Sequence, residues 1–394
     1  MSSLHTVRKL NLPPSEQLDG LARAAGDLYS RTVVTYWRLV RKKNVFLSQY
    51  GMERIHISPE LHAHTSDAIV GNFYASVKSA KARKKQGDKD AKYPRRRKRF
   101  FKVTWKASAI RVKNGLLVLS NGKGNAKLEI PWRFALPKQV EIGWKKTGGY
   151  ELRATYGVVP LRPEGNGGVA GVDQGEIRTA TVHDGEHSTI YSGRLVRSKN
   201  RYRAKTVAEL DAAISKTKRG SRRRKKLIRA KRRMLAKVDG QIKDILHKQS
   251  NHLVSALYQR GVQTVVIGDI RDIRKDLNYG KKTNQKLHGW SFGAFRQMVT
   301  YKAQRLGMQV VMQEESYTSQ TCPCCGAQHK PKGREYRCNC GFALDRDVVG
   351  AINIRRKYLG CFDTPVVGVY GSPLGIRYRP DMPCRSALPR TPCL

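Results

Sequence analysis

The chain has 394 residues, enough for two or three domains of roughly 100 to 200 residues each. Its 77 lysines and arginines against 30 aspartates and glutamates give a formal charge of +47. This excess argues against an ordinary solvated surface and favours a polyanionic partner, because neutralised phosphates release counterions and drive association. The start of the chain lacks the apolar core of a signal peptide, and no apolar run approaches the length of about 18 residues that crosses a membrane. We expect a cytoplasmic, nucleoid-associated protein with no membrane partner.

The N-terminal half predicts a small β domain with a helical insertion. Strand-like alternation at the start of the chain is followed by a helical pattern that begins near Ser15. Short alternating runs separated by glycine turns then continue to Leu161. The domains expected from this pattern are a β-barrel of residues 1–14 and 93–163 and a helical domain of residues 15–92.

Two segments combine dense positive charge with features suited to nucleic acid. The first follows the helical domain and is flanked by Tyr93 and Phe100, so cationic side chains can contact phosphates while aromatic rings stack on bases or sugars. The second opens a basic helical insertion at 200–260, whose apolar residues keep helical spacing on one face. Few acidic residues lie nearby, which favours phosphate binding over solvated charge. The candidate residues are Arg95, Arg96, Arg97, Lys98, Arg99, Arg222, Arg223, Arg224, Lys225 and Arg229.

The second half of the chain has an α/β pattern. The sequence VAGVDQG is typical of a buried strand that ends in Asp173 and turns into a hairpin. A later strand, helix and strand predict a parallel pair joined by a crossover, and aspartates then cap a final helix. The expected domains are an α/β domain of residues 168–317 and 344–360, a cysteine-rich module of residues 318–343 and an irregular tail of residues 361–394.

Five of the eight cysteines lie close together in the cysteine-rich module. In a reducing compartment such clustering favours metal ligation over disulfides, and four thiolates complete a tetrahedral zinc site. We predict one structural Zn²⁺ held by Cys322, Cys325, Cys338 and Cys340. Whether Cys324 also ligates the metal stays open.

Acidic residues close one strand, follow another and open the last helix, so the sheet can gather carboxylates at one edge. Hard divalent ions such as Mg²⁺ take oxygen ligands, and two of them about 3.5–4 Å apart can clamp the attacking and leaving oxygens of phosphodiester hydrolysis. The pattern therefore indicates a site for two catalytic Mg²⁺ ions.

Five motifs occur in one order: GVDQG, VVIGDI, SYTSQTCPCCG, YRCNCG and DRDVVGAINI. In this order they resemble the TnpB family of transposon-encoded proteins, relatives of the type V CRISPR effectors, over roughly residues 165–360. The resemblance implies an RNase H-like RuvC nuclease domain with an inserted zinc ribbon, preceded by a wedge barrel with a helical recognition region. It also implies an RNA-guided endonuclease that pairs a guide RNA from the transposon end with double-stranded target DNA beside a short motif. A monomer is favoured.

By this resemblance, Asp173 is the first catalytic acid and Asp347 the third, with Asp345 as the fallback. Two other functions stay open. One is a nuclease-dead, RNA-guided DNA-binding repressor, although retention of Asp173 and Asp347 argues against it. The other is a transposase or resolvase that acts without RNA.

The middle acid departs from the family pattern, because the strand that generally ends in Glu-Asp-Leu here reads Gly268-Asp269-Ile270. The strand that leads to Glu315 is expected about 4.8 Å away and parallel to it. A glutamate on that strand can reach across the side-chain-free Gly268 and supply the missing carboxylate. We predict a relocated catalytic Glu315, with Glu314 and Asp269 as alternates.

Overall fold

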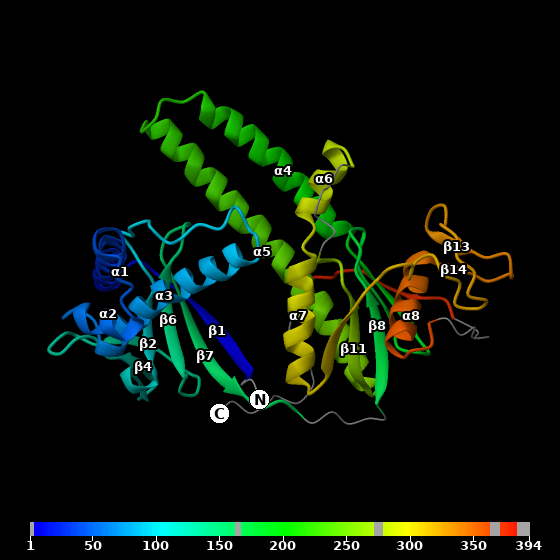
Figure 1. Ribbon diagram of the computed structural model, residues 1–394, viewed down its shortest axis with the longest axis horizontal. Helices are drawn as coiled ribbons and strands as arrows, with labels where there is room; N and C mark the ends of the chain where they lie inside the picture. Colours follow the sequence, from blue (N-terminus) through cyan, green and yellow to red (C-terminus); the bar gives the residue numbers. More distant parts are fainter. Residues whose placement is uncertain (1–3, 162–166, 272–278, 363–370, 384–394) are drawn as a thin grey trace. The chain divides into compact units, whose positions relative to one another are not determined.

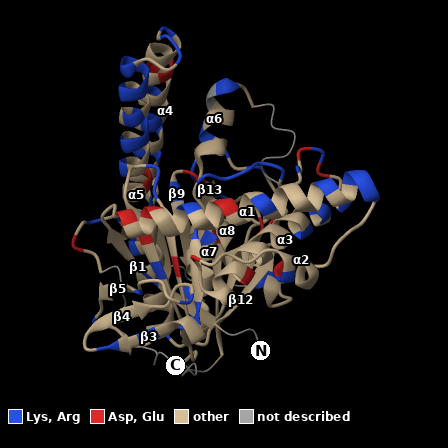
Figure 2. Cartoon of the chain, turned by 90° about the vertical axis from the view of Figure 1, so that its left-hand side faces the viewer, with Lys and Arg blue, Asp and Glu red and all other residues tan. Residues whose placement is uncertain are grey.

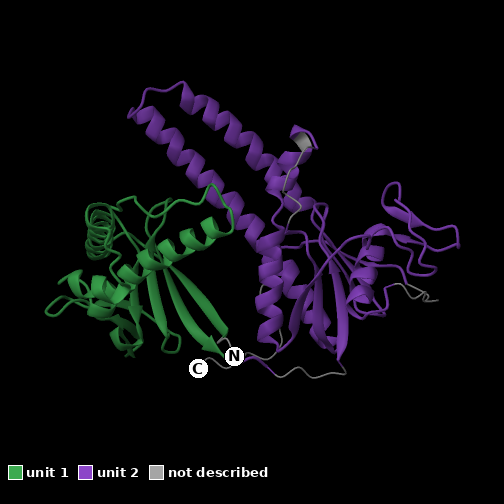
Figure 3. Ribbon diagram, in the orientation of Figure 1, with its two compact units in different colours: residues 1–158, 392–394 green, residues 159–391 purple. Residues whose placement is uncertain are grey.

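The computed structural model describes four stretches of the chain, residues 4–161, 167–271, 279–362 and 371–383. They divide into two compact units (Figure 3): unit 1 extends to Val158, and unit 2 begins at Val159. No described helix is both long and apolar enough to cross a membrane.

Unit 1 combines three helices with two antiparallel sheets around one apolar core. The first helix begins where Ser15 accepts a hydrogen bond from the Leu18 amide and ends at Asn44 in the left-handed conformation. Its apolar face packs on the sheets, with Leu28 fully buried. The helices are α1 (Glu16–Lys43), α2 (Gln49–Ile55) and α3 (Ala63–Lys85), with a short 3₁₀ turn η1 (Ala107–Ala109).

The strands of unit 1 are β1 (Leu4–Leu12), β2 (Val103–Lys106), β3 (Ile110–Lys113), β4 (Leu116–Leu119), β5 (Leu128–Pro131), β6 (Gln139–Trp144) and β7 (Tyr150–Val158). They form one sheet in the order β1-β7-β6-β2 and a second in the order β3-β4-β5. The predicted antiparallel strands and helical insertion are present. The predicted closed barrel is not confirmed, because the described strands pair as two separate sheets.

Unit 2 is built on a six-stranded mixed sheet with the order β12-β11-β8-β9-β10-β15. The predicted hairpin is present, because β8 pairs antiparallel with β9. The predicted parallel pair is present as well, because β11 runs parallel to both β12 and β8. The strands are β8 (Gly168–Asp173), β9 (Arg178–His183), β10 (Ser188–Ser192), β11 (Val262–Gly268), β12 (Gln309–Gln313) and β15 (Leu374–Ile376).

Helices cover both faces of this sheet (Figure 1). Residues Ala170 and Val172 of β8 join the core beneath α5 and α7, while Gly171 between them faces the other side and lies against the backbone of α8. A side chain at Gly171 would collide with the carbonyl of Ala351, so glycine permits the close approach of strand and helix. The helices of unit 2 are α4 (Arg194–Ser215), α5 (Arg222–Gln259), α6 (Lys281–Gly289), α7 (Phe292–Arg305) and α8 (Arg346–Tyr358).

The cysteine-rich module lies between β12 and α8 and contains the hairpin of β13 (Glu335–Arg337) and β14 (Ala343–Asp345). The predicted irregular tail needs a correction, because β15 adds to the sheet edge in parallel with β10. This strand has only three residues, and the exposed edge of β10 supplies its hydrogen-bond partners, so local sequence gave no signal for it. Much of the remaining tail lies outside the described residues.

Candidate functional site

Three carboxylates come together at one edge of the unit 2 sheet. Asp173 is the last residue of β8, Glu315 follows the end of β12 by two residues, and Asp347 lies in the first turn of α8. The parallel strands β8 and β12 flank β11, so their carboxyl ends meet at the same edge. The Asp173 side chain lies against Gly350, where an added Cβ would come within 2.7 Å of Asp173 Oδ2. Gly350 is on the same helix face as Asp347, three residues away.

The Glu315 side chain occupies space that a side chain at position 268 would otherwise fill. Even a methyl group at Gly268 would collide with the Glu315 carboxylate. The Oε1 atom of Glu315 is buried and accepts no hydrogen bond from the described residues. A buried carboxylate oxygen without a donor is costly in a folded protein unless a cation or donor satisfies it.

Burial and mutual repulsion raise the pKa values of these carboxyls. Burial and then the charge of Asp347 raise the pKa of Asp173 to about 7. Burial and then the charge of Asp173 raise the pKa of Glu315 to about 8. Burial also raises the pKa of Asp347, although the nearby Arg178 opposes this. Asp173 therefore interacts with both other carboxylates and is the central member of the group.

The two alternates for the middle acid, Glu314 and Asp269, form ion pairs with basic residues. Glu314 is exposed, pairs with Lys357 and accepts a 2.6 Å hydrogen bond from the Ser316 amide, so its pKa falls to about 2. Asp269 pairs with Arg271, which lowers its pKa. Of the three acids considered for the middle position, Glu315 is the one that faces Asp173.

Asp345 has a structural role that separates it from Asp347. It caps α8 by accepting a 3.0 Å hydrogen bond from the Asp347 amide. Both of its carboxylate oxygens also accept hydrogen bonds from the guanidinium of Arg178. The sequence did not reveal Arg178, because its pairing with Asp345 joins positions far apart in the chain.

The donor set of the carboxylate group fits divalent metal ions. Asp173, Glu315 and Asp347 offer hard oxygen ligands, and a bound divalent cation would favour the charged forms of Asp173 and Glu315, whose pKa values are raised. Arg178 lies 3.1 Å from Asp347, on the side of the carboxylate group that faces Asp345. The group therefore has the ligand chemistry that a divalent cation needs.

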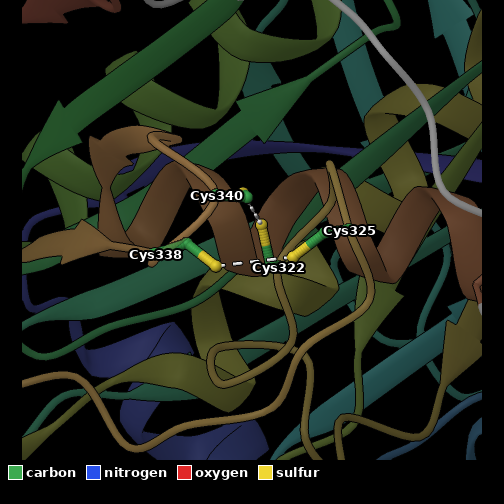
Figure 4. A group of neighbouring side chains, drawn as sticks. All are labelled: Cys322, Cys325, Cys338 and Cys340. Atoms are coloured by element: carbon green, nitrogen blue, oxygen red, sulfur yellow. Dashed lines mark hydrogen bonds between the residues drawn. The ribbon is translucent and has the colours of Figure 1, made fainter.

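The four predicted cysteines form a compact group (Figure 4). One ligand atom from each lies within 4.8 Å of all the others, and the four cysteines could hold a metal ion. Cys322 Sγ lies 3.8 Å from Cys340 Sγ, and Cys325 Sγ lies 3.4 Å from Cys338 Sγ. Sulfurs bound at about 2.3 Å in a tetrahedron are about 3.8 Å apart, so the spacing suits zinc. Cys324 lies outside this group.

The cysteine module is fixed to α8. The amide of Asn353 donates hydrogen bonds of 2.7 Å to the carbonyls of both Thr318 and Thr321, and Arg356 donates one of 2.8 Å to the carbonyl of Pro323. Strand β14 leads directly into α8 at Asp345. The fold of the module therefore sets the position of the first turn of α8, where Asp347 lies.

The basic segment of unit 1 is anchored by its backbone and exposes its side chains. Ser30 on α1 exchanges two hydrogen bonds of 3.0 Å with the backbone of Lys98, and Trp37 donates one of 2.8 Å to the carbonyl of Pro94. The guanidinium of Arg95 lies over the Trp37 ring at 4.9 Å. The predicted nucleic-acid residues of this segment are all exposed: Arg95, Arg96, Arg97, Lys98 and Arg99.

Positive charge also gathers along α4 and α5, which form an antiparallel helical hairpin (Figure 2). Arg222, Arg223, Lys225 and Arg229 are exposed near the start of α5. Arg224 differs from them, because its guanidinium donates hydrogen bonds of 2.7 and 3.1 Å to the carbonyls of Ile214 and Thr217 at the end of α4. This predicted phosphate ligand therefore holds the turn between the two helices.

Two family models match adjacent parts of the chain. The "Probable transposase" model of the OrfB_IS605 family matches residues 151–274, and the "Cas12f1-like, TNB domain" model matches residues 292–354, which contain the cysteine module. The resemblance to the TnpB family is confirmed. Both matched segments lie largely within unit 2, which carries the carboxylate and cysteine groups.

Curated relatives point to the same family. A TnpB-like protein of Methanocaldococcus jannaschii is 34% identical over 32% of this chain and 46% of its own length. A Streptomyces pristinaespiralis protein, provisionally named an RNA-guided DNA endonuclease, is 29% identical over 68% of this chain and 65% of its own length. The chain thus spans less than two thirds of the length of either relative.

Solved structures share the mixed α/β fold. A Cas12f1 chain, solved with its guide RNA and target DNA, matches 86% of this chain and 82% of its own length with a TM-score of 0.60 at 11% identity. The mini-RNA-guided endonuclease CRISPR-Cas_phi3 matches 93% and 94% with a TM-score of 0.52, also at 11% identity. At such low identity these likenesses concern the fold.

Proposed function

We propose that this protein is a TnpB-type, RNA-guided DNA endonuclease that hydrolyses target DNA beside a short motif. What supports the proposal most is the Glu315 carboxylate, which lies buried beside Asp173 in the space left by Gly268. A chain that had lost nuclease function would have no need to keep an unsatisfied carboxylate within the electrostatic influence of a second one. The names of the relatives agree with an RNA-guided endonuclease.

In this proposal a RuvC-like nuclease core uses Asp173, Glu315 and Asp347 to hold two Mg²⁺ ions. When bound, the ions supply Lewis acidity and a metal-activated water for attack on phosphorus. Asp173, Glu315 and Asp347 would hold these ions between them, with Asp173 central because it interacts with both other acids. Asp345 and Arg178 keep the first turn of α8 in place so that Asp347 faces Asp173.

The cysteine module and the exposed basic residues have separate roles in this proposal. One Zn²⁺ bound by Cys322, Cys325, Cys338 and Cys340 stabilises the module that leads into α8. The exposed basic residues of unit 1 and of α5 bind the guide RNA from the transposon end and its heteroduplex with the DNA. We propose that the protein acts as a monomer at the nucleoid.

The proposal is tested by moving the middle carboxylate back to its usual strand. Plasmid cleavage in Mg²⁺ is measured with protein co-purified with its transposon-end RNA. We expect Glu315→Ala to slow cleavage at least about a thousandfold, roughly 4 kcal/mol in the barrier. Adding Gly268→Glu to that variant should restore the rate to within about tenfold of wild type, because the new side chain enters the emptied space.

Glu314→Ala is the matched control, because Glu314 precedes Glu315 in the chain but is exposed and paired with Lys357. It should cleave at nearly the wild-type rate. Guided DNA binding without cleavage by the wild-type protein would support the repressor alternative instead. Cleavage that survives ribonuclease treatment of the purified complex would support the RNA-independent transposase or resolvase.

A further inference from the structure

A pocket of unit 2 adjoins the carboxylate group. It has a volume of about 440 Å³ and is lined by residues from β9, β10, the start of α4, the cysteine module and the tail after β15. Arg178 and Arg334 are among its lining residues, and they lie 3.1 and 3.6 Å from Asp347. The guanidinium groups of Arg178 and Arg334 therefore lie between the pocket and Asp347, one of the proposed catalytic acids.

The charge of this pocket is strongly positive. Among the residues that the structure describes, no acidic side chain lines the pocket. Four arginines do: Arg178, Arg194, Arg334 and Arg377. Arg194 and Arg377 are exposed, and no described carboxylate lies within the 4.0 Å of an ion pair from either. Arg178 and Arg334 already pair with carboxylates, so the positive charge available to a ligand comes from Arg194 and Arg377. Because the guanidinium fork matches the geometry of phosphate oxygens, a phosphate suits the pocket.

The pocket also offers an aromatic and apolar wall. Tyr378 lines it, and its hydroxyl donates a 2.7 Å hydrogen bond to Asp244 of α5, which fixes the ring. Ile177 and Leu195 add apolar surface. A phosphate site beside a fixed aromatic ring and apolar side chains suits a nucleotide unit, with its charge on the arginines and its sugar or base on the wall.

The tail completes this pocket. Strand β15 pairs with β10 in the register Thr189 to Leu374 and Tyr191 to Ile376, so Arg377 and Tyr378 directly follow the last paired residue. Lys248 of α5 donates a 2.8 Å hydrogen bond to the carbonyl of Pro380 and holds the chain beyond them. The residues at the pocket thus lie between two anchored points.

We propose that this pocket binds one nucleotide unit of the DNA strand that enters the carboxylate site, with its phosphate between Arg194 and Arg377. The inference rests on the proposed nuclease function. It assigns a role to the C-terminal tail, which holds the cut strand next to the scissile phosphate. DNA is favoured over guide RNA because the pocket shares its wall with Asp347.

Photo-crosslinking locates the strand directly. Target DNA carries 5-iododeoxyuridine at successive positions across the cut site and is irradiated on the full ribonucleoprotein in Ca²⁺ in place of Mg²⁺. We expect mass spectrometry to find the crosslink on the peptide containing Tyr378, with the label within a few nucleotides of the cut. A crosslink to this peptide from 5-iodouridine in the guide RNA, and none from DNA, would overturn the assignment.

Two substitutions test the arginines. We expect Arg194→Ala/Arg377→Ala to lower both crosslink yield and cleavage rate at least about tenfold, because two charge-assisted phosphate contacts are lost. Arg377→Lys keeps the charge but loses the fork, so it should give an intermediate loss. Arg379→Ala is the matched control, because Arg379 lies in the same tail, is exposed and does not line the pocket.

The outcomes separate this inference from the nuclease proposal. Equal crosslinking and cleavage by the Arg194→Ala/Arg377→Ala protein and the control would refute the pocket while leaving the nuclease intact. A DNA crosslink at Tyr378 that the double substitution abolishes, in a wild-type protein that never cleaves DNA, would keep the pocket and refute the nuclease. Thermal unfolding of each variant checks that the fold is retained.

Discussion

The cysteine group and the carboxylate group of unit 2 both gather metal-binding side chains, but they are assembled differently. The cysteines lie between Cys322 and Cys340 and meet within one small module. The carboxylates extend from Asp173 to Asp347 and meet because β8, β11 and β12 are parallel and α8 lies on the same sheet. A local group depends on a short chain segment, whereas a distributed group depends on the register of the whole sheet.

This difference predicts what each group does for the molecule. The cysteine module can hold its own shape once a metal closes it, since short loops have a low closure entropy. The carboxylate group repels itself, and the surrounding fold must hold it together. We therefore expect substitutions in the cysteine group to act mainly on stability and those in the carboxylate group mainly on cleavage.

The largest expected effect separates Asp347 from Asp345. Asp347→Asn should slow cleavage at least about a thousandfold, roughly 4 kcal/mol in the barrier, because it removes an anionic metal ligand beside Asp173. Asp345→Asn should slow it only about tenfold, since asparagine still caps α8 but pairs less strongly with Arg178. Single-turnover cleavage at saturating Mg²⁺ measures both. A more severe loss in Asp345→Asn would reverse the assignment.

The next effect concerns the cysteines. Cys338→Ser should lose the bound zinc and lower Tm by at least about 4 °C, one to two kcal/mol, because an open module no longer fixes the start of α8. Zinc content by mass spectrometry and thermal unfolding measure the change. Cys324→Ser and Cys361→Ser are the controls, because both residues lie outside the four-cysteine group. Zinc loss in Cys324→Ser would mean that Cys324 is a ligand.

The smallest effect is a pH dependence of stability. The pKa values of Asp173 and Glu315 are raised to about 7 and about 8, so between the ordinary carboxyl range and pH 8 the folded protein binds more protons than the unfolded one. The free energy of unfolding should therefore fall as pH rises from about 4 to about 8, by at least on the order of 1 kcal/mol.

Denaturant unfolding of the zinc-loaded protein without Mg²⁺ measures this decline. Asp173→Asn/Glu315→Gln should flatten it, because neither side chain then titrates. If the free energy of unfolding depended on pH equally in the variant and the wild type, the two carboxyls would not have raised pKa values in the folded protein.

Several elements of unit 2 could be predicted from the sequence. Apolar runs predicted β8 and β11, the aspartates predicted the start of α8, and cysteine spacing predicted the four-sulfur group. These features are local, because each depends on side chains close together in the chain. The closed barrel expected in unit 1 is not confirmed, since alternation predicts strands but does not determine whether a sheet closes.

The sequence favoured Glu315 but left its neighbour Glu314 open, and the tertiary structure places the two side chains differently. The two glutamates are adjacent and chemically identical, yet one lies over Gly268 beside Asp173 and the other pairs with Lys357 in solvent. Successive residues of an extended chain point in opposite directions, so a shift of one position exchanges a buried carboxylate for an exposed one. Strand β15 in the tail was not predicted either, because it forms only where the edge of β10 offers it hydrogen bonds. The sequence by itself determined which chemical groups are present, and the packing of distant strands decided which of them meet.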